Sequence, residues 1–307
     1  VGGTSAFYAA TLERPERHDL ETTATHPHPT GGWPVGYDAF KPWFALAEKT
    51  YHINGEVDPL APEGAELLAP IQPLPASDAA LMADLRRAGM HPYRTHMAAR
   101  FVEGCESCFG RRCPRRCKMD GRSAGILPAL ATGRAALIDN CTVTRIEADA
   151  GSVTSLTCQR DGQTLTLRAR RYILAGGGLG SPTLMLRSSS EHWPDGLGNR
   201  HDLVGRNLMF HLSEIIAIWA GKTRGEEGAS RSISLRDLYF IEGQRFGTVQ
   251  SMGLTAGFGE ILYALNKHFA RSPLSPIRPL RHGLRIPAWL AAKVMGHAKL
   301  FVGVLED

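Results

Sequence analysis

The chain has 307 residues, of which 43% are hydrophobic and 21% charged, a composition typical of a globular protein with one large or two medium domains. Lys and Arg outnumber Asp and Glu by 35 to 30, and this modest excess does not favour nucleic acid as a partner. The sequence predicts no transmembrane segment and no export signal, because it has neither a long apolar run nor a basic-then-apolar leader. The compartment stays open, with the cytoplasm as the default expectation.

The first part of the chain combines a glycine-rich start with helical patterns. Residues 1–9 read VGGTSAFYA, and residues 20–36, rich in Thr, His, Pro and Gly, are typical of an irregular loop. Apolar residues then recur at helical spacing and predict a helix from Asp38, its cap, to Tyr51. A second helix is predicted from Ser77, also as a cap, to Ala88.

Four of the six cysteines lie in one short segment with the spacing C-x2-C-x4-C-x3-C, namely Cys105, Cys108, Cys113 and Cys117. Four thiolates this close can surround one Zn or an iron–sulfur cluster, and the neighbouring Arg and Lys side chains favour the thiolate form. The alternatives are a compact loop with two disulfides or with free thiols. One functional hypothesis is therefore a metal-binding electron-transfer or interaction module, and another, a basic zinc-containing nucleic-acid binder, lacks the interleaved aromatic residues that such proteins use.

From Ala136 onward, hydrophobic and polar residues alternate with a period of two. Three such runs are separated by Ala150-Gly151 and by Asp161-Gly162, and the second dipeptide is a strong hairpin signal. The pattern predicts a small antiparallel meander.

A strand–glycine–helix connection follows the meander. Tyr172 to Ala175 form a continuous apolar run, which predicts a strand buried on both faces of a parallel sheet. Gly176, Gly177 and Gly178 come next, and a helix is predicted near Ser181-Pro182. Such a connection brings backbone N–H groups close to a ligand and suits a nucleotide phosphate or ribose, although it lacks the complete dinucleotide fingerprint.

The C-terminal part contains an amphipathic pattern that predicts a helix from Phe258 to Phe269. The stretch after it mixes Pro, Arg and apolar residues. Two interpretations are open: the segment lies on a membrane surface, or it packs on its own domain or on another part of a longer protein. The second is the favoured expectation.

Taken together, these segments resemble the glucose-methanol-choline (GMC) oxidoreductases, a family of FAD-dependent alcohol oxidases and dehydrogenases. The resemblance rests on five stretches in the same order as in the family: VGGTSAFYA, GGWPVGYDAFKPWFALAE, TVTRIEAD, AGGGLGSPTLMLRSS and GLGNRHDLVGRNLMFH. It is best over residues 101–211, fair over 1–51 and faint after 221.

The resemblance implies an α/β fold, α+β overall, and FAD as the cofactor. It divides the chain into a partial Rossmann-like FAD-binding domain with an antiparallel meander, residues 1–208, and the start of an antiparallel-sheet substrate domain, residues 209–307. The first domain includes a helical or lid segment at 38–100 and the cysteine-rich loop at 105–117. The implied cofactor contacts are Gly2, Gly3, Thr4, Ser5, Tyr8, Val143, Ala175, Gly176, Gly177 and Asn207.

The resemblance also implies a reaction. The full-length parent is expected to oxidise a CH–OH group of an alcohol, sugar or polyol to a carbonyl, with hydride passing to the flavin and a base taking the proton. The chain is expected to be an internal fragment, without the family's N-terminal ADP-binding motif and C-terminal catalytic segment, and to be inactive alone. No catalytic residue is identified in it, and the electron acceptor stays open. Some bacterial relatives pass electrons onward through an iron–sulfur cluster, which gives the four cysteines a role within the same family.

Overall fold

The computed structural model of the chain describes residues 3, 6–61, 63, 72–103, 105, 112–219, 230–254 and 256–305. The chain divides into two compact units, Val1–Leu127 with His211–Asp307, and Pro128–Phe210. Each unit is described by itself. The division expected between a cofactor domain and a substrate domain at 208/209 stays a prediction.

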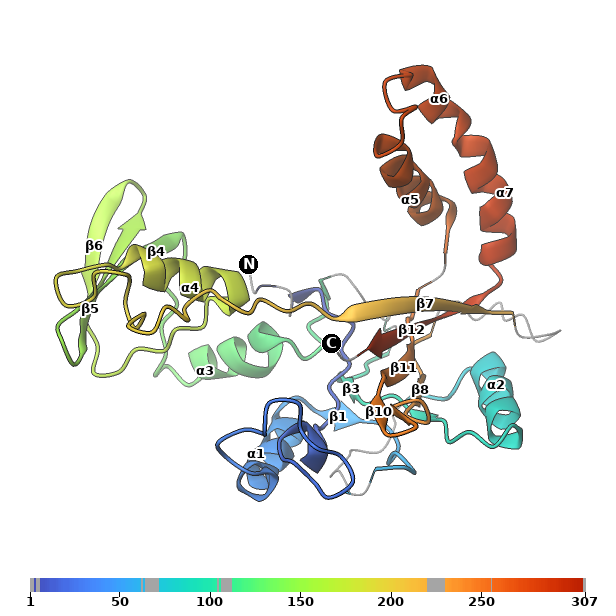
Figure 1. The fold of residues 1–307 in the computed structure, drawn as a ribbon, viewed down its shortest axis with the longest axis horizontal. Coiled ribbons are helices and arrows are strands. Elements are labelled where there is room, and N and C mark those ends of the chain that lie inside the picture. The colour runs from blue at the N-terminus through green and yellow to red at the C-terminus, as the bar shows by residue number, and fades with distance from the viewer. Residues whose placement is uncertain are drawn as a thin grey trace. The chain divides into compact units, whose positions relative to one another are not determined.

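A five-stranded antiparallel sheet forms the largest element of the first unit (Figure 1). Its strand order is β2-β8-β11-β12-β7, so that strands far apart in the sequence become neighbours. The bounds are Tyr93–Arg94 for β2, Leu212–Ile218 for β7, Ile233–Leu235 for β8, Gly247–Ser251 for β11 and Lys299–Leu305 for β12. The longest ladder joins β12 to β7, with Phe301 opposite Ile216.

The core of this unit lies between the sheet and helix α2, Ala76–Arg87. Leu81 and Met82 of the helix pack against Ile233 of β8 and Phe301 of β12, and all four are buried. The predicted second helix is therefore confirmed with slightly earlier bounds. Ser77 lies inside the helix, because Pro75 occupies the cap position.

A second, smaller cluster forms around the N-terminal segment. Helix α1, Tyr37–Thr50, leads into β1, Ile53–Asn54, which pairs with β3, Met97–Ala98. Ile53, Ala98 and Met119 are buried together there, with Tyr8 and Tyr51 packed against them. The predicted first helix is confirmed, but its cap position is Gly36, and the Tyr37 N–H donates to Glu21 Oε1 at 2.5 Å.

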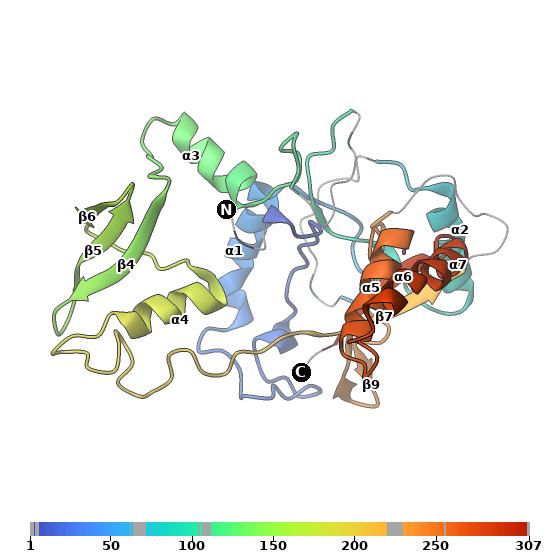
Figure 2. The same ribbon diagram turned by 90° about the horizontal axis from the view of Figure 1, so that it is seen from above.

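Two further groups of elements complete the first unit. A short hairpin pairs β9, Phe240–Ile241, with β10, Gln244–Arg245. Helices α5, Phe258–Ala270, α6, Arg278–Gly283, and α7, Arg285–Met295, lie side by side in both views (Figures 1 and 2). None of the described helices combines the length and apolar character that crossing a membrane requires.

The second unit contains the predicted meander. Strands β4, Cys141–Ala148, β5, Val153–Arg160, and β6, Gln163–Leu167, pair antiparallel in sequence order (Figure 2). Asp161 and Gly162 both have positive φ, as the tight hairpin turn between β5 and β6 requires. Helix α4, Gly177–Arg187, is tied to β4 through Ser188, whose Oγ accepts the Ile146 N–H at 2.9 Å. The mixed α/β class with antiparallel sheets is confirmed.

The connection between the meander and α4 differs from the prediction. Tyr172 to Ala175 form no strand, and Ile173 is 92% exposed. An apolar run becomes a buried strand only where neighbouring strands pair with it, and within the described chain none does. Helix α4 also begins four residues earlier than predicted, at Gly177, and Pro182 lies inside it.

Candidate functional site

Tyr8, expected near the flavin, is held on both sides by the segment around Met119. Its hydroxyl donates to Met119 O at 2.5 Å, and the buried Lys118 ammonium donates to Tyr8 O at 2.9 Å. Burial, together with the nearby Tyr51 and Asp120, raises the pKa of the Tyr8 hydroxyl above its ordinary value. Tyr8 is therefore a neutral, fixed ring and not a proton acceptor.

A cavity of about 390 Å³ opens beside this ring, within the first unit. This volume lies within the usual range for small-molecule sites. One part of its wall is aromatic or aliphatic and includes Phe44, Tyr51 and Ile53, while the other carries charge from Glu13, Arg14, Glu48 and Asp120. The combination of an apolar wall with a few polar groups is that of a ligand pocket.

Arg14 and Glu48 form a buried ion pair in the cavity wall. Arg14 Nε donates to Glu48 Oε1 at 2.8 Å, and a second guanidinium nitrogen donates to Oε2 at 2.7 Å. Both side chains are less than a tenth exposed. The two-point geometry satisfies both carboxylate oxygens, which explains how two charges are tolerated away from water.

Asp120 closes another side of the cavity and shapes the chain that follows. Its Oδ1 accepts the Ser123 N–H at 2.7 Å, which caps the π-helical turn Gly121–Ile126. Helix α3, Leu127–Ala131, continues directly from that turn. One carboxylate oxygen of Asp120 is thus already engaged in holding the backbone.

His96 lies buried near the same charged residues and is bound through both ring nitrogens. Nδ1 lies 2.7 Å from Glu13 Oε2, and Nε2 lies 2.8 Å from the backbone oxygen of Glu56. Both partners are acceptors, so the geometry suits an imidazolium that donates twice. Burial lowers the pKa of His96, but the bond to Glu13, the charge of Glu13 and the Glu56 carbonyl raise it more, and the net pKa is above its ordinary value.

The hydrogen bonds of His96 to Glu13 and Glu56 make the free energy of unfolding depend on pH. Because the folded-state pKa of His96 is raised, its stabilising contribution is complete below about pH 6.5 and is lost as the pH rises through the folded-state pKa. We expect His96→Gln to lower the free energy of unfolding at pH 6 by about 1.5 kcal/mol, the lower end for hydrogen bonds to charged groups. Urea titrations at pH 6 and pH 8.5 should show a smaller loss at the higher pH. The exposed His201→Gln serves as the control, and an equal loss at both pH values would contradict the assignment.

In the second unit, the two glycines at the start of α4, Gly176 and Gly177, occupy positions that favour glycine. A Cβ on Gly176 would lie 3.1 Å from Ser181 N and 3.2 Å from Ser181 Oγ, and Gly177 has φ of +77°. Ser181 Oγ accepts the Gly176 N–H at 2.9 Å from inside the helix. Ala175 and Gly176 are exposed at the N-terminal end of α4, where backbone N–H groups remain available to an anion.

Val143 and Asn207 lie elsewhere in this unit. Val143 is half-buried in β4 opposite Cys158, and the ladder shifts register directly after it, which leaves Thr144 out of the regular pairing. Asn207 is exposed and has φ of +57°, a conformation that Asn tolerates better than most residues. Their assignment as cofactor contacts stays a prediction.

Three of the N-terminal residues expected to contact the cofactor, Gly2, Thr4 and Ser5, lie outside the described residues. Gly3 is described and has φ of +65°, a backbone conformation that favours glycine. Its assignment, like theirs, stays a prediction.

The cysteine cluster is only partly visible, because Cys108 lies outside the described residues. Cys113 Sγ lies 3.3 Å from Cys117 Sγ, which lies 3.9 Å from Cys105 Sγ, and all three are free thiols. Burial raises the pKa of Cys113, but backbone N–H groups, first that of Lys118, and the Cys117 thiol lower it below its ordinary value. Within the described ranges, no three His, Cys, Asp or Glu side chains form a metal-binding arrangement.

Apart from Tyr8, the cavity residues were not identified from the sequence as site residues. A usable signal was present in α1, where Glu48 shares one helical face with Phe44 and Tyr37. A charged residue on an apolar face indicates a buried partner, here Arg14. Lys118, Met119 and Asp120 gave no comparable local signal, because their roles depend on contacts with Tyr8.

Comparison with known proteins identifies the class of protein that carries this site. The family model described as GMC oxidoreductase matches residues 1–213, more than half of the chain. The chain therefore belongs to the GMC oxidoreductases.

Similar curated proteins carry the names of dehydrogenases and oxidases. The chain is 27% identical over 292 residues to 2-methyl-1,2-propanediol dehydrogenase of Mycolicibacterium austroafricanum, covering 87% of this chain and 51% of that protein. It is 28% identical to paromamine 6'-oxidase of Streptomyces fradiae (71% and 42% covered) and 26% identical to the fructose dehydrogenase large subunit of Gluconobacter japonicus (72% and 44%). The chain spans about half the length of these relatives.

Proposed function

We propose that this chain is the cofactor-holding part of an FAD-dependent oxidoreductase that oxidises a CH–OH group of an alcohol, sugar or polyol. The family match over residues 1–213 carries the proposal, because the family implies FAD. The names of the relatives, a diol dehydrogenase, a paromamine oxidase and a fructose dehydrogenase subunit, support hydroxylated small molecules as the substrate class.

The residues present fit a bound dinucleotide. In the Gly176–Gly177 turn a Cβ at Gly176 would make tight contacts with Ser181, and backbone N–H groups lie at the start of α4. We assign these groups, with Ala175, to the nucleotide portion, and Val143 to the adenine. Gly2 to Ser5, Tyr8 and Asn207 are the remaining cofactor contacts that we propose from the resemblance to the family.

A bound flavin would supply the acceptor for a hydride from the substrate's carbinol carbon. The side chains of this chain bind and orient the cofactor and the substrate. Tyr8 presents a ring whose hydroxyl is engaged with Met119, and Phe44, Tyr51 and Ile53 give the cavity beside it an apolar wall. Arg14 neutralises Glu48 in that wall. None of the described residues is assigned here as the general base.

The absorption spectrum of the full-length protein tests the proposal. We expect flavin bands that bleach when a diol or hexose is added without an electron acceptor. Gly176→Val should remove most of the bound flavin, because its side chain would collide with the backbone of Ser181, whereas Gly178→Ala should retain it, because a Cβ at Gly178 meets open space. A protein that folds without flavin, or a Gly176→Val variant with full flavin content, would refute the assignment.

The same spectrum tests the metal-binding alternative. This alternative takes Cys105, Cys108, Cys113 and Cys117 as the ligands of an iron–sulfur cluster or Zn, and it rests on their spacing in the sequence, since the described residues form no metal-binding arrangement. An iron–sulfur cluster would add a broad brown shoulder that Cys113→Ser removes while the flavin bands stay. A flavin spectrum without that shoulder, and without Zn by metal analysis, would leave these cysteines as thiols or disulfides.

A further inference from the structure

Helices α5, α6 and α7 carry the positive charge of the whole chain. Residues 258–297 contain six Lys or Arg residues and one acidic residue, Glu260, a net charge of +5. The complete chain also has a net charge of +5, so the remainder is electrically balanced. The positive charge of the chain is therefore concentrated in residues 258–297, which we call the basic helical segment.

The basic helical segment also exposes large apolar side chains. No residue of α5 is buried, and Ala288 is the single buried residue of α7. The exposed apolar residues include Ile286, which is 68% exposed, and Trp289, which is 51% exposed. The expectation that the segment packs on its own domain or on another part of a longer protein stays a prediction. The full set is Tyr263, Leu274, Ile277, Leu280, Ile286, Trp289, Leu290 and Val294.

Within α7 the exposed residues share one face. Ile286, Leu290 and Val294 follow each other at four-residue spacing, and Trp289 and Lys293 lie between them on the same side, opposite the buried Ala288. Lys293 Nζ lies 3.8 Å from the centre of the Trp289 ring. An aromatic ring beside an ammonium on an apolar stripe is typical of helices that lie in the membrane–water interface.

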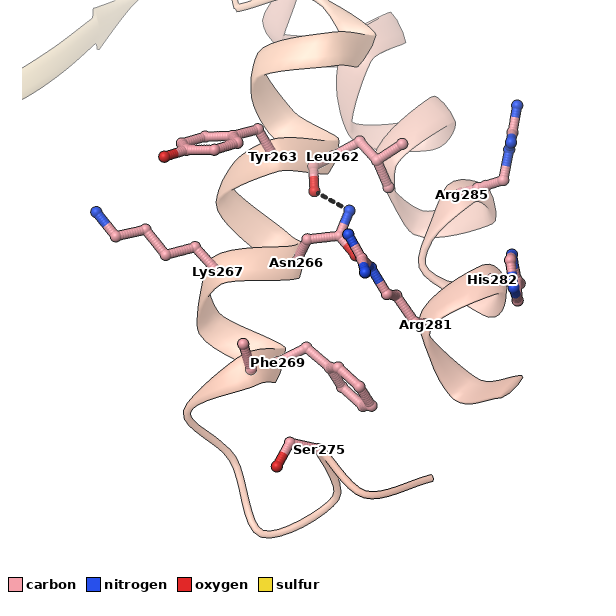
Figure 3. Close-up of a pocket in the computed structure, with 10 residues that line it drawn as sticks. Leu262, Tyr263, Asn266, Lys267, Phe269, Ser275, Arg281, His282 and Arg285 are labelled. Carbon is pink, nitrogen blue, oxygen red and sulfur yellow. Dashed lines mark hydrogen bonds between the residues drawn. The ribbon is translucent and has the colours of Figure 1, made fainter. Parts of the chain in front are cut away.

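A cleft of about 970 Å³ lies between α5 and the two following helices. Figure 3 shows Arg281, His282 and Arg285 on one side of it and Leu262 and Phe269 of α5 on the other. Arg281 Nε donates to Asn266 Oδ1 at 2.8 Å, which fixes the guanidinium at the cleft. None of the described residues that line the cleft is acidic, so it suits an anionic group attached to an apolar chain.

We propose that the basic helical segment docks the protein on an anionic phospholipid surface. The apolar face of α7 enters the interface, and the cleft with Arg281 and Arg285 receives a lipid phosphate. Charge complementarity selects this occupant, since another protein surface would have to be both acidic and apolar to match the face equally well. The inference does not depend on the flavin.

Vesicle sedimentation with the full chain tests the proposal. We expect binding to phosphatidylcholine vesicles that contain about one third phosphatidylglycerol, and little binding to phosphatidylcholine alone. Arg285→Gln with Lys293→Gln should weaken binding about 30-fold, at roughly fivefold per charge near the surface. The matched control, Arg168→Gln with Arg170→Gln, removes two exposed charges from the second unit and should change binding less than twofold.

A second pair of variants separates apolar insertion from simple charge attraction. Ile286→Ser with Leu290→Ser should weaken binding at least tenfold, and Ile173→Ser, which alters a still more exposed apolar residue of the second unit, should have no effect. Brominated lipids should quench wild-type fluorescence, and Trp289→Phe should remove most of that quenching. Circular dichroism confirms that each variant is folded.

Four outcomes would overturn the proposal. The first is an absence of vesicle binding, and the second is equal binding to charged and uncharged vesicles. The third is a concentration-dependent dimer in sedimentation velocity that the Ile286→Ser/Leu290→Ser variant abolishes, with no lipid binding, which would assign the face to a second copy of the chain. Free inorganic phosphate that binds as well as the vesicles would likewise remove the lipid as the occupant.

Discussion

Glu48→Ala should lower the free energy of unfolding by about 3–5 kcal/mol, the cost of leaving one member of a buried ion pair without its partner. The variant leaves the Arg14 guanidinium in a site where its side chain is 7% exposed, with Glu48 removed from both of its nitrogens. Replacing both members, as Arg14→Met with Glu48→Leu, should recover much of the loss, because no charge is then buried. Guanidinium titrations followed by circular dichroism measure each value.

An exposed ion pair provides the matched control. Asp84 and Arg87 also form an ion pair, on α2, but their side chains are mostly exposed. Asp84→Ala should therefore change the free energy of unfolding by less than about 1 kcal/mol. If Glu48→Ala were no more destabilising than Asp84→Ala, the Arg14–Glu48 pair would not be buried as described.

Like Glu48→Ala, Gly247→Ala should lower the free energy of unfolding substantially. We expect a loss of at least about 3 kcal/mol, the upper part of the range for overpacking. A Cβ at position 247 would lie 1.8 Å from Val304 O, and Gly247 has φ of +148°. The obstructing atom belongs to the backbone of β12, the strand paired with β11, so no side-chain rotation can relieve the contact. The two central strands would have to separate at that point. Thermal unfolding of the purified variant measures the loss.

Gly303→Ala tests whether the effect comes from this contact or from any added methyl group in the sheet. Gly303 lies in β12, and a Cβ there would meet its nearest neighbours at 3.8 and 3.9 Å, an ordinary contact distance. We expect its stability to stay within about 0.5 kcal/mol of wild type. Similar melting temperatures for the two alanine variants would contradict the close approach of Gly247 to Val304.

The sequence predicted those parts of the fold that depend on local patterns. The helices α1, α2 and α5 and the meander from β4 to β6 follow from apolar periodicity and from Asp161-Gly162. The five-stranded sheet was not assigned strand by strand, because β2 and β8 are very short and pair across a long sequence separation. The strand predicted at Tyr172 to Ala175 was wrong for a related reason. An apolar run forms a strand only where neighbouring strands pair with it, and the sequence of the run does not show whether they do.

The candidate site likewise has one part that the sequence predicted and one part that it did not. The glycines at 176 and 177 were predicted, because backbone conformation is visible in glycine patterns, and the structure gives each a steric reason. The cavity beside Tyr8 was not predicted, because residues 8–15, 44–53 and 119–121 contribute to it from separate parts of the chain. Only Glu48, a charge on an apolar helical face, gave a hint of it.

The double attachment of Tyr8 sets a length scale for the glycine-rich start of the chain. Gly3 lies five residues before an anchor that is held by Met119 and Lys118. A fully extended tether of that length reaches roughly 17 Å. A molecule that contacts both the Tyr8 ring and Gly3 must therefore have the two contacted groups within roughly 17 Å of each other. The segment cannot reach a ligand farther from Tyr8 than that.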